Sequence, residues 1–246
     1  MSENVPNHSE NVSNLGILTS KLQSFGSRYN PSNSMLAIAN LNQLKAQGET
    51  ILDTITTAEI NARSVQSAHT AIFNDFDTLV TRISNTLNVC GAPATTITQG
   101  QSIIRELRGK RASALLTAEE LAAEKEKGND VRQITIHNST MNEKTNNFGK
   151  LIQFLSTVQQ YAPNEPELTI PSLTNKLNEM KSLFNALTEA NTTLEVARTN
   201  RKKIMYSEET GLVNVAQSAK QYVKAAFGAN SDEYNQVKGI RFSNKG

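Results

Sequence analysis

Apolar residues recur along this chain at alternating steps of three and four, the spacing of an amphipathic helix. One stripe runs from Gly48 to Ile72 and is broken only at His69, and a second stripe runs from Met180 to Ile204. Each stripe predicts a helix of about ten turns, over about residues 39–74 and 171–206. A shorter apolar pattern precedes each stripe and predicts a first helix over about residues 12–28 and 138–160.

Prolines separate the first and second predicted helices. Pro31 and Pro163 cannot continue a helix, so residues 29–33 and 161–166 are expected to form turns. A third helix is predicted at about residues 79–89 and 212–227, and a short fourth one before Gly109 and Gly239. Three or four helices with short connections are typical of an up-down bundle.

The same segment occurs twice in the chain. Nine identities lie at a constant shift of 132 between residues 29–78 and 161–210, against about three expected by chance. They begin with Tyr29 and Pro31, which match Tyr161 and Pro163. The sequence therefore predicts an all-α fold of two tandem up-down helical bundles, three to four helices each, related by internal duplication. The predicted domains are residues 1–111 and 133–246, joined by a partly helical linker at 112–132.

The linker carries one strong local signal. Thr117 and Glu120 have the spacing of a capping box, which predicts a helix over about residues 118–127. Residues 131–136 alternate as a strand does, but an isolated strand is only marginally stable. We therefore expect an extended lead-in to the second bundle there.

Composition narrows the function classes. The 246 residues include 25 Lys and Arg and 23 Asp and Glu, a net charge of +2, and the mean hydropathy is −0.43. This balance indicates no global field for nucleic acid or an anionic membrane. The first ten residues are polar and unlike a signal peptide, and no apolar run has the length of a membrane span. We expect a cytoplasmic protein, with signal-independent secretion left open.

Residues with reactive side chains are few and scattered. Cys90 is expected to be a buried small hydrophobe at a helix end. His8, His69 and His137 lie far apart without helical metal-ligand spacing, and His69 is expected near a bundle edge. The prediction is therefore no catalytic, cofactor-binding or metal-binding residue, no cofactor and no enzymatic activity.

Two other features have an alternative interpretation each. The basic clusters, Arg198, Arg201, Lys202 and Lys203, and Arg105, Arg108, Lys110 and Arg111, could bind nucleic acid, but the low aromatic content favours a solvated face or a partner for the helix dipole. Tyr29 and Tyr161 could line two equivalent pockets. A packed corner, with the hydroxyl reaching water or backbone, is the favoured interpretation.

Several segments resemble a known group of proteins. Residues 161–170, 206–213, 222–228 and 237–242 are similar to those of uncharacterised bacterial duplicated helical-bundle proteins. The resemblance implies an all-helical duplicated fold and a bacterial source. It implies no activity and no functional residue.

These observations predict a non-enzymatic soluble structural or protein-interaction module that binds a protein partner or itself, without nucleic acid or a membrane. The alternatives are a membrane-active helical bundle of the pore-forming or toxin-like kind, and a small-ligand-binding protein with a cavity between the two bundles. The copies differ most around residues 92–101 and 112–132. A site, if there is one, is expected there.

Overall fold

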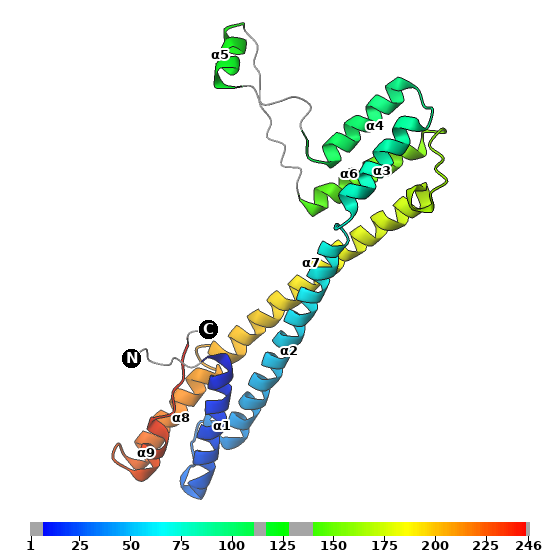
Figure 1. Cartoon of the computed structure of the whole chain (residues 1–246). Coiled ribbons are helices and arrows are strands. Elements are labelled where there is room, and N and C mark those ends of the chain that lie inside the picture. Colours follow the sequence, from blue (N-terminus) through cyan, green and yellow to red (C-terminus); the bar gives the residue numbers. More distant parts are fainter. Residues whose placement is uncertain (1–6, 111–116, 128–139, 245–246) are drawn as a thin grey trace. The chain divides into compact units, whose positions relative to one another are not determined.

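A computed structural model describes residues 7–110, 117–127 and 140–244, and all regular structure in these ranges is helical (Figure 1). The all-α class is thus confirmed. The predicted residues 131–136 and His137 lie outside the described residues. The α-helices and the short 3-10 helices (η) follow in the order α1 (His8–Ser24), η1 (Gly26–Arg28), η2 (Ser34–Leu36), α2 (Ile38–Ala71), α3 (Phe76–Val89), α4 (Ala94–Leu107), α5 (Ala118–Glu126), α6 (Met141–Ser156), η3 (Pro166–Leu168), α7 (Ile170–Tyr206), α8 (Leu212–Phe227) and α9 (Asp232–Lys238).

Local sequence signals fix many of the helix ends. The predicted capping box of Thr117 and Glu120 is present at the start of α5. Asn7 with Glu10 forms another at the start of α1, and Thr140 with Glu143 does so at the start of α6. Each box satisfies backbone N–H groups that have no partner inside the helix. Three helices therefore begin where the sequence itself supplies the missing acceptors.

The long helices end close to their predicted limits. α7 runs to Tyr206, and the backbone N–H of Gly211 then donates to the Ser207 carbonyl at 3.0 Å. The matching stretch after α2 has no glycine, but a turn at residues 72–75 still separates α2 from α3. A fourth helix follows in both halves, although α4 has 14 residues and α9 only 7.

The chain divides into two compact units that differ from the predicted domains. Unit 1 comprises residues 1–64 and 189–246, and unit 2 comprises residues 65–188. Each unit therefore joins the first part of one half of the sequence to the last part of the other, instead of following the boundaries at 111 and 133. The helices α1 and α8 each have an apolar stripe that stays exposed to water unless another element covers it. Within unit 1 these two stripes face one another.

The core of unit 1 is built from α1, the start of α2, the end of α7, and α8 and α9. Its buried apolar side chains are Val12, Leu15, Leu18, Leu22, Phe25, Tyr29, Leu36, Leu41, Leu44, Met205, Leu212, Val213, Val215, Ala216, Ala219, Val223 and Val237. Within this core the ring of Tyr29 meets the edge of Tyr222, with centroids 5.3 Å apart. Leu15, Leu18 and Leu22 are fully buried, so α1 is an integral part of the unit.

The core of unit 2 is built from the matching elements: the end of α2, then α3, α4, α6 and the start of α7. Its large side chains include Phe76 and Phe148, whose rings meet edge to face at 5.1 Å, and both are almost fully buried. α4 packs against α6, and α3 contacts η3 as well as α4. Residues on both sides of the linker are thus required to close this core too.

The two tyrosine corners have the same hydrogen bond. The hydroxyl of Tyr29 donates to the Leu36 carbonyl at 2.8 Å, and that of Tyr161 donates to the Leu168 carbonyl at 3.1 Å. Burial raises the pKa of Tyr29 above its usual range and that of Tyr161 to about 12. Both rings are at least nine-tenths buried, which is the packed corner expected from the sequence and leaves no room for a ligand at the hydroxyl.

Two helix glycines provide a matched test of the packing in unit 2. A Cβ at Gly100 would lie 2.4 Å from Leu87 Cδ2 and 2.8 Å from Phe154 Cε1, whereas at Gly149 the nearest atom, Leu177 Cδ2, is 3.4 Å away. Gly100→Ala is expected to lower the free energy of unfolding by about 1–2 kcal/mol, since overpacking outweighs the gain in helix propensity. Gly149→Ala is expected to leave it unchanged or raise it by up to about 1 kcal/mol. Urea unfolding measures both, and equal shifts for the two variants would contradict this packing.

Candidate functional site

The two described histidines belong to different units. His8 lies in unit 1 and His69 in unit 2. Among residues 7–110, 117–127 and 140–244, no group of three or more His, Cys, Asp and Glu side chains is close enough to hold a metal ion. In the same part of the chain, no helix is both long and apolar enough to cross a membrane.

The expectation that His69 lies at a bundle edge is wrong. Its side chain is only 5% exposed, and its ring packs against Phe73 and Phe184 with centroids 5.7 and 6.3 Å apart. The Nδ1 atom has no hydrogen-bond partner. The apolar stripe of α2 runs through this position, so packing of the stripe buries the histidine as well.

Cys90 lies at the C-cap of α3, as expected, but it is half-buried and not fully buried. Its thiol donates to the Leu87 carbonyl with Sγ and oxygen 3.1 Å apart. The basic residues at the end of α4 make local contacts, since Arg105 donates to Ser102 at 2.9 Å and Arg108 to Thr81 at 2.8 Å. Arg111 is outside the described residues.

The segment in which the two halves of the sequence differ has a structural role. Residues 94–101 form the first half of α4, where Gly100 packs closely against Leu87 and Phe154. Gln101 accepts a hydrogen bond from the Ser84 hydroxyl at 3.0 Å and donates one to Asn88 at 2.8 Å. Of the linker, residues 117–127 are described and contain α5. The prominent cavity lies elsewhere, in unit 1.

A cleft of about 1130 Å³ lies between α1 and α2 of unit 1. A Cβ at Gly16 would lie 2.9 Å from Lys45 Cε, and one at Gly48 would lie 2.8 Å from Val12, so the two helices run antiparallel and approach closely there (Figure 1). The lining residues are Ser9, Val12, Ser13, Gly16, Ile17, Ser20, Lys45, Glu49, Leu52, Asp53, Ile55, Thr56, Glu59 and Arg201. We call this space the α1–α2 cleft.

The α1 side of the cleft consists mainly of small side chains. Ser9, Ser13, Gly16 and Ser20 follow one another at steps of four, three and four, so they share one face of the helix. The regular spacing of these small residues can be read from the sequence, but a search for regularly spaced apolar residues does not find it. The α2 side is charged, and two of its carboxylates are ion-paired: Glu49 with Lys45 at 2.7 Å and Glu59 with Arg198 at 3.0 Å.

Arg201 of α7 also lines the cleft, which differs from the solvated position expected for the basic cluster. Its Nε atom is buried and has no hydrogen-bond partner. Lys202 and Lys203, the next residues of the cluster, are exposed as expected. A buried guanidinium N–H without an acceptor costs free energy, so an acceptor atom in the cleft would bind favourably there.

A polar cluster beside Arg201 joins α1 to the end of α7. His8 Nδ1 and the Tyr206 hydroxyl are hydrogen bonded at 2.6 Å. Burial, and then the charge of Arg201, lower the pKa of His8. Burial raises the pKa of Tyr206, while a hydrogen bond with Asn11 and the charge of Arg201 oppose the rise. The neutral imidazole is therefore the form that this cluster favours.

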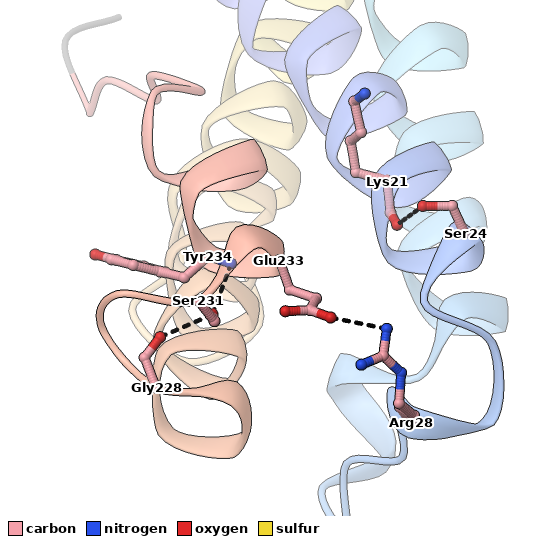
Figure 2. A network of polar contacts seen from close by, with 7 residues as sticks. All are labelled: Lys21, Ser24, Arg28, Gly228, Ser231, Glu233 and Tyr234. Atoms are coloured by element: carbon pink, nitrogen blue, oxygen red, sulfur yellow. Dashed lines mark hydrogen bonds and ion pairs between the residues drawn. The ribbon is translucent and has the colours of Figure 1, made fainter.

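The 3-10 helix η1, which follows α1, is joined to α9 by an ion pair. Figure 2 shows Arg28 pointing toward Glu233 in the first turn of α9, and the two charged groups are 2.7 Å apart. Ser231 caps α9, since its hydroxyl oxygen accepts from the backbone N–H of Tyr234 at 3.1 Å. Arg28 also lies over the Phe227 ring at 5.4 Å. Contacts of His8 at the start of α1 and of Arg28 shortly after its end thus connect this part of the chain to the C-terminal part of unit 1.

Comparison with protein-family models, with curated proteins and with solved structures finds no match to this chain. Its function is therefore inferred from the geometry of the α1–α2 cleft and its surroundings.

The lowered pKa of His8 predicts a pH-dependent stability. The unfolded chain takes up a proton near the usual value of 6.5 and the folded chain only at lower pH, so stability is present above pH 6.5 and decreases as the pH falls below it. We expect the melting temperature of the wild type to fall more between pH 7.5 and 5 than that of His8→Gln. Because the site is partly solvated, the difference stays below about 1 kcal/mol. Identical pH profiles in calorimetry would contradict this role of His8.

Proposed function

We propose that this chain is a non-enzymatic protein-interaction module and that the α1–α2 cleft is its binding surface. The observation that carries the proposal is the cleft itself, which is open to solvent along a helix face of small side chains. Its volume of about 1130 Å³ exceeds the roughly 300–1,000 Å³ of common small-molecule pockets. A partner helix lying along α1 and α2 matches this size and shape better than a compact ligand does.

The lining supports a helical partner in detail. Ser9 and Ser20 are eleven residues apart, a rise of about 16 Å or three turns of helix. The small side chains between them allow another backbone to approach closely, and Val12, Ile17 and Leu52 supply apolar contacts. Ile17 is 49% exposed, which is unusual for isoleucine and favours its burial by a partner. The arrangement is that of a groove for an amphipathic helix.

The charges indicate the chemistry of that helix. Glu49, Asp53 and Glu59 lie on the α2 side of the cleft, and Asp53 is exposed. An amphipathic helix with basic residues beside its apolar stripe would complement these carboxylates. A second copy of this chain carries exposed Lys202 and Lys203 at the end of α7, so self-association is one form of this proposal.

We further infer that the scaffold around the cleft arose by internal duplication. α2 and α7 begin 132 residues apart, as do η2 and η3, and the two tyrosine corners share one hydrogen bond at the same shift. α1 and α6 match when the shift between the two halves is one residue larger. In this alignment Gly16, which faces Lys45, corresponds to Gly149, which faces Leu177. On this inference, the two units share a scaffold and differ in the side chains that line the cleft of unit 1.

A small anionic ligand in the same cleft is the second candidate. It is favoured by the buried Nε of Arg201, which has no hydrogen-bond partner and could donate to a carboxylate or phosphate oxygen. Arg201→Gln would abolish binding of such a ligand. It would reduce binding of a helix only in part, since the apolar contacts remain.

Site-specific photo-crosslinking tests the proposed surface. A photoreactive phenylalanine at Ile17, in the cleft, is expected to give a defined protein adduct in the native cell, and the same group at Val89 is not. Val89 is the matched control, because it is 82% exposed but lies in unit 2. The mass of the adduct distinguishes a second copy of this chain from another protein.

A blocking substitution completes this test. Ser13→Phe should fill the cleft and reduce the adduct at Ile17 at least fivefold, while Ser24→Phe, an equal change at an exposed position outside the lining, should not. Adducts of equal yield at Ile17 and Val89, or an adduct insensitive to Ser13→Phe, would exclude the cleft as the binding surface.

A further inference from the structure

The segment that follows α9, residues 240–244, is held by side chains of unit 1 that bind its backbone. Asn11 Nδ2 donates to the Ser243 carbonyl at 2.9 Å, and Asn11 Oδ1 accepts from the Ser243 N–H at 3.0 Å. One amide thus satisfies both backbone groups of one residue, as a neighbouring β-strand would. Asn11 is 0% exposed in this arrangement.

Two further contacts extend this backbone recognition. Asn14, one turn along α1, donates from Nδ2 to the Arg241 carbonyl at 2.9 Å. Lys220 of α8 donates from Nζ to the carbonyls of Ile240 at 2.5 Å and Lys238 at 3.0 Å. Burial lowers the pKa of Lys220. Side chains of α1 and α8 therefore bind backbone groups of three residues of the segment, Ile240, Arg241 and Ser243.

The alternate side chains face the protein core. Ile240 and Phe242 are half-buried and pack against the apolar core of unit 1, while Arg241 is exposed. In an extended chain, successive side chains point to opposite sides, so positions 240 and 242 share one side. The recognised pattern is consequently an extended backbone with apolar residues at two alternate positions.

The buried side-chain amide of Asn11 uses the backbone of the extended segment as a hydrogen-bond partner. Loss of hydrogen bonds by a buried amide costs on the order of 1–3 kcal/mol. Release of Ser243 would leave Asn11 with its hydrogen bond to Tyr206, so a backbone bound beside Asn11 stabilises this position. With the one-residue offset between α1 and α6, the matching residue is Lys144, whose Nζ lies 3.9 Å from Asp77. The amide at position 11 is thus a difference between the two halves, and the pattern of apolar residues gives no sign of it.

We propose that the face of α1 carrying Asn11 and Asn14 is a binding site for an extended peptide, which residues 240–244 of the same chain occupy, and that the partner in trans is this segment of a second copy. Reciprocal exchange retains each hydrogen bond described above, because the second copy offers the identical segment. Gly239, the C-cap of α9, connects the helix to the segment. Neither Asn11 nor Asn14 lines the α1–α2 cleft, so this site is independent of the proposed function.

A synthetic peptide with the sequence of residues 239–244 tests the site. Phe242→Ala in the full-length protein weakens the competing internal segment, and the labelled peptide should bind this variant at least tenfold more tightly than the wild type. Adding Asn11→Leu should weaken that binding at least tenfold. Asn61→Leu, the same change at an exposed position of α2, should not alter it. A folded Phe242→Ala protein that shows no saturable binding up to 1 mM peptide would overturn the proposal.

The wild-type protein provides a second measurement that needs no destabilised variant. Excess peptide should displace the internal segment and accelerate hydrogen exchange of the Ser243 amide at least fivefold, and an unchanged rate would overturn the proposed site. Light scattering tests the partner. The wild type at about 1 mM should contain dimers that Asn11→Leu lacks, and a strict monomer that nevertheless binds the peptide would retain the site but exclude the second copy as its partner.

Discussion

Neither core can close unless helices from the two halves of the sequence pack against each other. In unit 1 the buried face of α1 lies against α8, and in unit 2 that of α6 lies against α4. A single amphipathic helix cannot bury its own apolar stripe, so each half of the chain supplies what the other lacks. The candidate sites depend on this pairing, because α1 acquires its position only when residues 189–246 are present.

The sequence predicted what is local. Proline positions, capping boxes and 3.6-residue periodicity located the helices to within a few residues, because each of these signals acts over a turn or two. The tyrosine corner is another local feature, with the hydroxyl bound seven residues further along the chain. Even the break after α2, which lacks a glycine, lies close to its predicted place.

The pairing of the helices could not be predicted in the same way. An apolar stripe indicates that a helix face is buried, but it does not indicate which other helix covers that face. Two tandem bundles, and two units that each combine helices from both halves of the sequence, are therefore equally compatible with the pattern. The same limit explains the error at His69 and the missed residues of unit 1. Asn11 is polar yet fully buried, because its hydrogen-bond partner Ser243 lies 232 residues away.

On the internal duplication that we infer, matching positions in the two units carry different side chains. Lys45 at the α1–α2 cleft corresponds to Leu177, and Leu52 corresponds to Phe184, which packs on His69. At these two positions unit 1 has a charged side chain and a smaller one, where unit 2 has Leu177 and Phe184. Both proposed binding surfaces lie in unit 1.

The dependence of both cores on both halves can be measured directly. A protease site placed after Arg111 allows the folded protein to be cut between the halves, and the products can be followed by size exclusion with light scattering. If each core needs both halves, the fragments remain together as one 27.0 kDa species that unfolds in a single transition. Two separate fragments that each retain their helical content would contradict the exchanged arrangement.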